Sequence, residues 1–543
     1  MSEKVVVIGL DAACFDRIDP FLERGDLPNL QRLLDRGGGT DLETTTPPWT
    51  PSAWPSIVTG TEPQAHGVYD FFNHGPDYEH ELVSAKDIQV PFLWEYLSER
   101  GQSSIVVNVP VTNPAHAFDG TLIPGYLAPE NPTCLVDGEA RPLSEIDPEY
   151  RIYADRNDPD EATLDEYERL IHSRASLSKR LADEYDWSFM MVQFQRTDSV
   201  YHTFGADEEA ASRVYSAVDK AIGSLLDGID EECNVLVVSD HGIWQYESVF
   251  YVNSWLKENG YLATTADSNR IGWNATTKEK LKGDHGETGS TSARIGGAVI
   301  GALDRVGLSP QVAEALLAKV GLDTAVRKLL PNEILEDSIR HVDWSNSDVY
   351  CRSTSSLGLR FNVEERETDG VVSSDSFETA RKRLIEELEA IESPDGEPVF
   401  DEVLDRHDVW GDDIPNESSA PDIIYRPNDM RWEISDIVKS DPFESTEVFN
   451  HNYSGLLIAA GPDIEWKRPG QPHATDIAPT ILSLLGVSPP AEMSGAVLES
   501  ICTSDQSTER PPTVGGRRYL GDGDTTETDS VVADRLRDMG YME

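Results

Sequence analysis

The stretch "KVVVIGL" (residues 4–10), followed directly by Asp11, is the clearest indication of the fold class. Its apolar residues run without the alternation of a half-exposed strand, and this is typical of a strand buried on both faces of a parallel sheet. Open parallel sheets present ligands at the carboxyl ends of their strands, so Asp11 stands where a functional group is expected. The alternative is that Asp11 simply caps the next turn.

The same kind of apolar run recurs along the chain and alternates with helical patterns. Strands are predicted at 103–110, 187–195, 233–240 and 455–464, and helices at 27–37, 92–101, 165–185, 206–227 and 476–486. Strands that alternate with helices predict an α/β domain, with a mostly parallel sheet flanked by helices.

The stretch from about 244 to 450 interrupts this alternation. It contains a predicted helix around 253–262, a polar segment at 265–292, helical patterns near 294–330 and mixed strand and helix patterns with a helix at 376–392. We interpret it as a large α+β insertion, or cap, in a catalytic core formed by 1–243 and 451–500. Residues 503–543, rich in Thr, Asp, Gly and Pro, are predicted to form a loosely ordered acidic tail.

The chain of 543 residues is strongly acidic, with 98 Asp and Glu against 45 Lys and Arg and a formal net charge of −53. Hydrophobic residues make up 38%, enough for a core, which argues against intrinsic disorder. We interpret the charge as halophilic, an adaptation to a salt-rich cytoplasm as in halophilic archaea, because salt screens the repulsion. No basic patch is evident, so binding to a nucleic-acid backbone is not expected.

Other features of the sequence concern location and redox chemistry. The five cysteines are odd in number, widely spaced and without a CxxC pattern, which predicts neither a disulfide framework nor a cysteine-based zinc site. The first residues lead straight into a strand without the pattern of a signal peptide, and no apolar run approaches the length of a membrane span. These features predict a soluble, cytoplasmic protein.

Thr50 stands between Trp49 and Pro51 at the start of a predicted helix. Thr is a good N-cap and Pro is favoured at the first helical position, so capping is the simpler explanation. The start of a helix also favours an anion such as a phosphate, which makes the Thr50 hydroxyl a candidate nucleophile. Ser52 is a weaker candidate for the same role.

Six Asp and His side chains fall near the ends of predicted strands or the start of the last predicted helix. They are Asp11, Asp198, His202, Asp240, His241 and His473. Each alone is explained by a cap, a turn or an ordinary helix pair. Together, three carboxylates and three imidazoles are too many for one tetrahedral site and suit two neighbouring sites for Zn²⁺, with Mn²⁺ or Fe as alternatives. Two such ions can clamp the attacking and leaving oxygens of a phosphoryl displacement.

Five segments, in their order and spacing, resemble the alkaline phosphatase superfamily, in its branch of type I phosphodiesterases and nucleotide pyrophosphatases. They are "VIGLDAA", "TPPWTPSAWPSIVTGTEPQAHGVYDF", "QRTDSVYHTFG", "SDHG" and "HATDIAPTILSLLG". The middle section further resembles a prokaryotic group of predicted phosphohydrolases or phosphomutases. The resemblance covers most of residues 1–490 and implies an alkaline-phosphatase-like sheet with helices on its faces.

The resemblance implies a role for each matching residue. Thr50 matches the nucleophile that forms a covalent phospho-enzyme. Asp11, Thr50, Asp240 and His241 match one metal site, and Asp198, His202 and His473 match the other. The implied function is metal-dependent hydrolysis of a phosphodiester or nucleotide pyrophosphate with two divalent ions. The expected partner is a small-molecule phosphate ester or a nucleotide.

Other functions remain open on the same fold: a phosphomonoesterase or phosphomutase, a phosphotransferase, or a catalytically silent metal-binding scaffold. Diester cleavage is favoured over monoester cleavage because no Arg dedicated to clamping a dianionic phosphate is evident near Thr50. Arg196, two residues before Asp198, is the nearest candidate. A sulfatase is disfavoured because "TPSAW" lacks the C/S-x-P-x-R pattern of those enzymes.

Overall fold

A large mixed sheet forms the centre of the computed structural model, which describes residues 4–229, 232–266, 340–412, 414, 416–502 and 510–520. In the described part of the chain its strand order is β2-β22-β10-β1-β9-β5-β6-β7-β8. The strands are β1 (Val5–Leu10), β2 (Gly38–Glu43), β5 (Ser104–Val107), β6 (Gly120–Ile123), β7 (Thr133–Val136), β8 (Glu139–Pro142), β9 (Phe189–Phe194), β10 (Asn234–Val238) and β22 (Ser454–Ala460).

The central strands of this sheet are parallel. β1 pairs in parallel with β10 and β9, with Val5 opposite Asn234 on one side and Phe189 on the other, and β9 and β6 flank β5 in the same sense. All six residues of β1 are buried, as its continuous apolar run predicts. β22 is antiparallel to both β10 and β2. The predicted α/β fold with a mostly parallel sheet is therefore confirmed.

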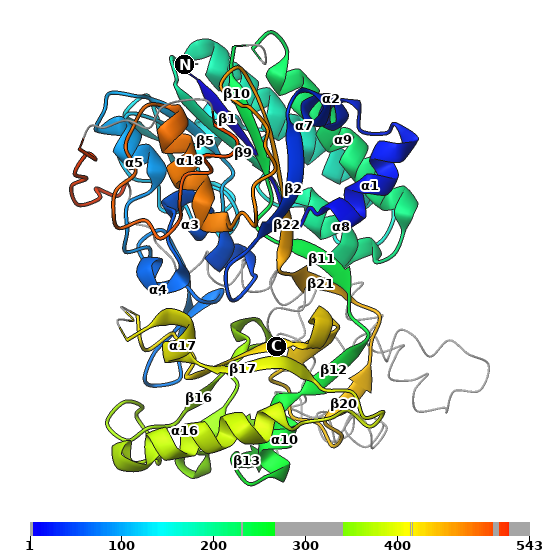
Figure 1. Ribbon diagram of the computed structural model, residues 1–543, viewed down its shortest axis with the longest axis vertical. Helices are drawn as coiled ribbons and strands as arrows, with labels where there is room; N and C mark the ends of the chain where they lie inside the picture. The colour runs from blue at the N-terminus through cyan, green and yellow to red at the C-terminus, as the bar shows by residue number, and fades with distance from the viewer. Residues whose placement is uncertain are drawn as a thin grey trace, which may run out of the picture.

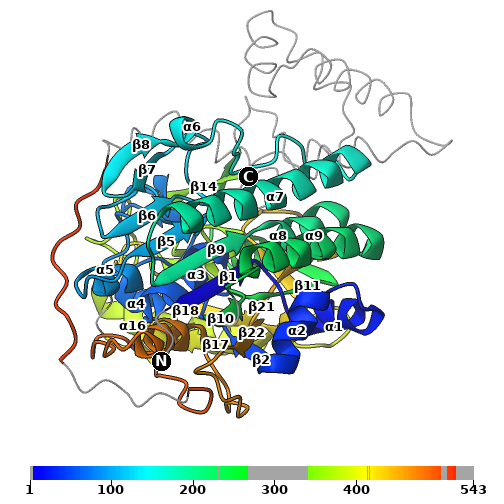
Figure 2. The ribbon, with the colours of Figure 1, turned by 90° about the horizontal axis from the view of Figure 1, so that it is seen from above.

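Helices cover both faces of the sheet (Figures 1 and 2). The helices on one face are α1 (Phe15–Arg24), α2 (Pro28–Arg36), α7 (Glu161–Glu184), α8 (Arg196–Phe204) and α9 (Glu208–Leu226). The helices on the other side are α3 (Thr50–Thr59), α4 (Pro63–His66), α5 (Leu93–Ser98) and α18 (Ile477–Leu484), with the short α6 (Leu143–Ile146) after the β7–β8 hairpin. The helices predicted at 27–37, 92–101, 165–185, 206–227 and 476–486 match α2, α5, α7, α9 and α18.

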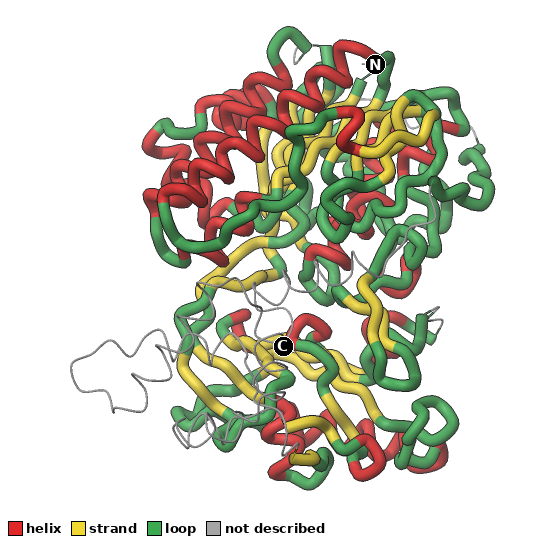
Figure 3. The backbone as a smooth tube through the Cα atoms, turned by 180° about the vertical axis from the view of Figure 1, so that it is seen from behind, coloured by secondary structure: helices red, strands yellow, loops and turns green. Residues whose placement is uncertain are grey.

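The segment between β10 and β22 builds a second layer of structure below the carboxyl ends of the central strands (Figures 1 and 3). Its strands are β11 (Gly242–Gln245), β12 (Ser248–Tyr251), β13 (Thr264–Ala266), β14 (Arg340–Val342), β15 (Val349–Tyr350), β16 (Gly358–Phe361), β17 (Phe400–Asp405), β18 (Ile423–Pro427), β19 (Trp432–Ser435), β20 (Phe443–Ser445) and β21 (Phe449–Asn452). Its helices are α10 (Val252–Glu258), α16 (Ser374–Glu389) and α17 (Arg406–Trp410).

This second layer has the predicted α+β character. β15-β16-β18-β17 form one sheet, and β19-β12-β20 form another. β11 and β21 pair antiparallel and lead into and out of the insertion. The polar segment at 265–292, beyond Ala266, and the helical patterns near 294–330 lie outside the described residues. The division into 1–243 plus 451–500, 244–450 and 503–543 stays a prediction.

The second layer is attached to the core through Asp70, which lies shortly before β3 (Phe72–His74), the strand that pairs with β4 (His80–Leu82). Asp70 is buried, and its carboxylate accepts hydrogen bonds from Ser353, at 2.5 Å, and from Ser355. The amide of Asn416 donates to the carbonyl of Gly67 at 3.1 Å. These bonds hold the insertion against the segment that follows α3.

Part of the predicted tail lies along the core. Arg517 places Nε 2.9 Å from Glu95 Oε2 and donates to the carbonyls of Ile88, at 2.5 Å, and Val90. Its guanidinium carbon is 4.4 Å from the ring centroid of Phe92. The described residues 510–520 are thus held by a largely buried ion pair and several hydrogen bonds.

We expect Arg517→Ala to lower the free energy of unfolding by about 2 kcal/mol, because it leaves Glu95, a buried carboxylate, without its cationic partner. Urea unfolding followed by tryptophan fluorescence in molar KCl measures the change. The neighbouring Arg518 is exposed, and Arg518→Ala, as control, should change stability by less than about 0.5 kcal/mol. Equal losses for the two variants would contradict this anchoring role.

Two further features bear on the sequence predictions. All five cysteines are free thiols. In the part of the chain that the structure describes, no helix combines the length and apolar character needed to cross a membrane.

Candidate active site

The carboxyl ends of β1, β9 and β10 bring together most of the predicted site residues. Asp11 follows β1, Asp198 lies in the first turn of α8 after β9, and Asp240 and His241 follow β10. This edge of the sheet faces the insertion (Figure 1). The strand order, with β1 between β9 and β10, explains why residues more than 180 positions apart become neighbours.

Asp11, Asp240 and His241 form the first group of candidate metal ligands. They offer one ligand atom each, all within 4.8 Å of one another, and all three side chains are fully buried. Hydrogen bonds fix Asp11 in place, since Oδ2 accepts from Gln193 Nε2 at 2.6 Å and from Trp54 Nε1 at 3.2 Å. Its other oxygen remains directed toward the group.

Thr50 is the first residue of α3, and its hydroxyl lies against the first group. Oγ1 is 3.2 Å from His241 Nε2 and 3.4 Å from Asp11 Oδ1. The side chain is 4% exposed. Ser52 differs, because its hydroxyl donates to the carbonyls of Pro47 at 2.9 Å and Trp49 at 3.0 Å. Of the two hydroxyls predicted as nucleophiles, the structure brings Thr50 to the acidic cluster.

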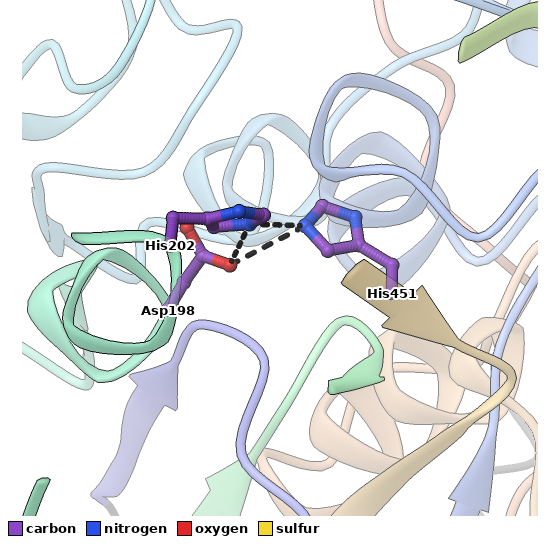
Figure 4. A group of neighbouring side chains, drawn as sticks. All are labelled: Asp198, His202 and His451. Carbon is purple, nitrogen blue, oxygen red and sulfur yellow. Dashed lines mark hydrogen bonds and ion pairs between the residues drawn. The ribbon is translucent and has the colours of Figure 1, made fainter. Parts of the chain in front are cut away.

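Asp198, His202 and His451 form the second group (Figure 4). Asp198 and His202 are one turn apart on α8, with 3.0 Å between Asp198 Oδ1 and His202 Nε2. His451 approaches from β21 and places Nε2 3.3 Å from both Asp198 Oδ1 and His202 Nε2. The three side chains converge on one point from two elements.

The two groups are neighbours. The imidazole rings of His241 and His451 stack with their centroids 3.7 Å apart and an interplanar angle of 21°. Each ring belongs to a different group, so the stack joins the groups directly. The arrangement is that of two adjacent cation sites rather than one.

The electrostatics of the cluster favour bound cations. Burial raises the pKa of Asp11 well above its usual value, and the charges of Asp240 and Asp198 raise it further. Burial also raises the pKa of Asp198, but His202 and His451 outweigh it and bring the net value far below the ordinary one. Burial, together with His241, lowers the pKa of His451 to about 3, so its imidazole is neutral at pH 7 and can offer a lone pair.

Two enclosed carboxylate oxygens support the fit of the groups to metal ions. Asp198 Oδ1 and Asp240 Oδ2 are buried, and an imidazole nitrogen lies 3.0 Å from each of them. Buried carboxylate oxygens normally have donors or ions as partners. The first group offers two carboxylates and one imidazole, and the second group offers one carboxylate and two imidazoles. Both sets of ligands suit Zn²⁺, Mn²⁺ or Fe.

His473 does not join the second group, and this corrects the sequence prediction. Its Nε2 lies 3.2 Å from the carbonyl oxygen of Thr44, and its Nδ1 lies 2.9 Å from Thr475 Oγ1. His473 caps the short helix η4 (Ala474–Asp476), and its backbone bridges to Glu43 at the end of β2. β2 is separated from β10 by β22, so His473 lies to the side of the cluster.

His451 takes the place expected for His473 because β22 is antiparallel. The start of β22, rather than its end, therefore lies at the carboxyl edge of β10, and His451 stands three residues before that start. β21 also pairs with β11, which places His451 opposite Ile243, just after His241. The sequence signal for His451 is a histidine shortly before the apolar run "GLLIAAG". The prediction missed it because it considered only residues that follow strands or precede the last helix.

Comparisons with known proteins agree with this geometry. The family model for type I phosphodiesterase / nucleotide pyrophosphatase matches residues 5–454. The chain belongs to this family. As a type I phosphodiesterase / nucleotide pyrophosphatase family member it is a phosphoric ester hydrolase, and the matched range contains Thr50 and every residue of both groups.

Solved structures of other enzymes share the fold of this family member. Wild-type alkaline phosphatase PafA has a TM-score of 0.53 at 15% identity, covering 92% of this chain and 99% of that one. Phosphonoacetate hydrolase from Sinorhizobium meliloti 1021, in complex with phosphonoformate, has a TM-score of 0.50 at 15% identity, covering 88% and 94%. These likenesses support an alkaline-phosphatase-like fold. No curated protein matches the sequence.

Proposed function

We propose that this phosphodiesterase family member hydrolyses phosphodiesters or nucleotide pyrophosphates, with Thr50 as the nucleophile and two divalent metal ions as cofactors. The main support for the proposal is the position of the Thr50 hydroxyl. It lies 3.2 Å from His241 and 3.4 Å from Asp11, beside two adjacent groups of potential ligands. A hydroxyl used only to cap a helix needs no such surroundings.

Asp11, Asp240 and His241, with Thr50 Oγ1 beside them, would hold one ion, and Asp198, His202 and His451 would hold the other. The ligand sets suit Zn²⁺ best, with Mn²⁺ or Fe as alternatives. Divalent ions bound there would act as Lewis acids that lower the pKa of a hydroxyl and stabilise charge on phosphoryl oxygens.

Thr50 performs the first chemical step in this proposal. Its Oγ1 forms a bond to phosphorus while the bond from phosphorus to the leaving oxygen breaks. The hydroxyl proton passes to water, and the leaving oxygen takes up a proton from water. Water then cleaves the phospho-threonine, which restores the hydroxyl and releases the phosphoryl group. The buried start of α3 keeps Thr50 in place through both steps.

Hydrolysis of bis-p-nitrophenyl phosphate, compared with p-nitrophenyl phosphate, tests this function. The assay uses molar KCl, because the net charge of −53 requires screening. We expect faster turnover of the diester, loss of turnover in metal-depleted protein, and recovery when Zn²⁺ or Mn²⁺ is added back.

Undiminished turnover by metal-depleted protein would contradict the metal-dependent part of the proposal. Faster turnover of the monoester would contradict the choice of substrate and favour a phosphatase or phosphomutase. Circular dichroism of the metal-depleted protein provides the control that its fold is retained.

A further inference from the structure

Two buried arginines lie near the start of α8, the helix that carries Asp198 and His202 of the second group. Arg196 opens α8, two residues before Asp198, and Arg174 lies in the middle of α7. Arg174 has no exposed surface and Arg196 is 5% exposed. Both guanidiniums reach the same carbonyl oxygen, that of Ile152, with Nη2 of Arg174 at 2.6 Å and Nη2 of Arg196 at 3.4 Å.

Neither guanidinium forms an ion pair with a carboxylate of the described residues. Arg174 Nε and Nη1 and Arg196 Nε are enclosed, and a polar side chain that interacts with Arg174 is Tyr150. Arg196 also contacts the ring of Tyr167, whose centroid is 5.1 Å from the guanidinium carbon. Burial, together with the positive charge of Arg196, lowers the pKa of Arg174 to about 10, although Tyr150 and Glu130 raise it, so Arg174 remains charged at pH 7.

Other buried arginines of this chain are paired. Arg360 places Nε 2.8 Å from Glu367 Oε1, and Arg406 places Nη1 3.2 Å from Asp422 Oδ1. Arginines are almost never fully buried without a partner, because an uncompensated buried charge strongly destabilises the folded state. The Arg174–Arg196 pair is therefore a buried cationic site with no ion pair to a carboxylate of the described residues; the charge of Glu130 acts on Arg174, but its carboxylate accepts a hydrogen bond from the amide of Ile152 at 3.2 Å.

A chain of polar contacts connects this pair to the candidate active site. Gln193 donates to Asp11 at 2.6 Å and accepts from Asn108 Nδ2 at 2.7 Å, and Asn108 Oδ1 lies 3.4 Å from the hydroxyl of Tyr150. Tyr150 in turn interacts with Arg174. The pair thus lies at the same edge of the sheet as Asp11.

We propose that Arg196, reinforced by Arg174, binds a second anionic group of the substrate, separate from the phosphoryl group that reacts at Thr50. This inference rests on the proposed function. Because Arg196 retains a little exposed surface and Arg174 none, Arg196 contacts the anion and Arg174 is a positioning residue behind it. The substrate class is a phosphate ester that also carries a phosphoryl or carboxylate group, whose oxygens match the donors of a guanidinium.

Three diesters that share the same leaving group, p-nitrophenolate, test the proposal. They are propyl, 2-carboxyethyl and 2-phosphonoethyl p-nitrophenyl phosphate. For the wild type, we expect kcat/KM to be about 10-fold to 100-fold higher for a diester with the second anionic group than for the propyl diester. Comparison of the carboxyethyl and phosphonoethyl diesters shows whether the site prefers a carboxylate or a phosphoryl group. Arg196→Gln should remove this preference, so that kcat/KM for the two charged diesters falls to about that for the propyl diester. Arg196→Lys should keep part of the preference.

A control variant removes a positive charge elsewhere. Arg213 on α9 pairs with three surface carboxylates, and Arg213→Gln should leave the preference for charged diesters intact. Equal losses on all three diesters in Arg196→Gln would overturn the proposal, because they would show that Arg196 supports the fold or the ligand Asp198. The absence of any preference in the wild type would overturn it as well.

Calorimetric binding separates failure of this inference from failure of the proposed function. Methylenediphosphonate has two anionic groups and methylphosphonate has one, and neither requires turnover. We expect the wild type to bind the diphosphonate at least about 10-fold more tightly, and Arg196→Gln to reduce this ratio to about one. If no diester is hydrolysed but this ratio holds, the hydrolytic function fails and the anion site stands. If diesters are hydrolysed and the ratio is one in the wild type, the anion site fails alone.

Discussion

Thr50→Ala is expected to lower kcat/KM for bis-p-nitrophenyl phosphate by on the order of 10³-fold or more, because it removes the atom that attacks phosphorus. The substitution removes a hydroxyl 3.2 Å from His241 and 3.4 Å from Asp11 and leaves the candidate ligands in place. Steady-state kinetics with added Zn²⁺ measures the loss. Mass spectrometry of protein quenched during turnover should detect a phosphorylated Thr50 peptide in the wild type and none in the variant.

Two neighbouring variants make the test specific. Thr50→Ser keeps a hydroxyl and should retain turnover within about 10-fold. Ser52→Ala removes a hydroxyl whose contacts are the carbonyls of Pro47 and Trp49, and it should change turnover by less than about threefold. Loss of activity in Ser52→Ala together with full activity in Thr50→Ala would show that the nucleophile has been assigned to the wrong residue.

His451→Ala should lower kcat/KM for the same diester by about 100-fold or more, because His451 is one of only three side chains of the second group. His473→Ala should leave kcat/KM within about threefold. It removes the cap of η4, so the expected effect is a loss of about 1 kcal/mol of stability. Steady-state kinetics and urea unfolding of both variants separate the two roles.

The same pair of variants can contradict the structural assignment. A large loss of turnover in His473→Ala, with His451→Ala near wild type, would restore the prediction made from the sequence. It would also mean that the 3.3 Å approach of His451 to Asp198 has no functional role.

Much of the fold was predictable because the central strands have a simple signature. β1 is buried on both faces, and its six apolar residues show this without any structural knowledge. The amphipathic pattern of α7 likewise marks its helical character. The antiparallel direction of β22 was not predictable, because a buried strand has the same apolar sequence in either direction. The docking of Arg517 depends on partners more than 400 residues away and has no local pattern.

The candidate site residues were predictable where the direction of the neighbouring strand was predictable. Asp11, Asp198, Asp240 and His241 follow parallel strands, where the end of each strand marks the active edge. His202 was found because it lies one helical turn after Asp198. His451 was missed because it precedes an antiparallel strand, and His473 was chosen because it precedes a helix at the same edge of the sheet. The buried pair formed by Arg174 and Arg196 becomes visible only when their burial and contacts are known.

The number of metal ions bound per chain tests the central claim most directly. Equilibrium dialysis against Zn²⁺ in molar KCl, followed by elemental analysis, should give two ions per chain for the wild type and for His473→Ala. His451→Ala should retain the ion of the first group and bind the other at least about 100-fold more weakly. Fewer than two ions in the saturated wild type, or two ions of unchanged affinity in His451→Ala, would contradict a two-metal site built from Asp11, Asp240 and His241 on one side and Asp198, His202 and His451 on the other.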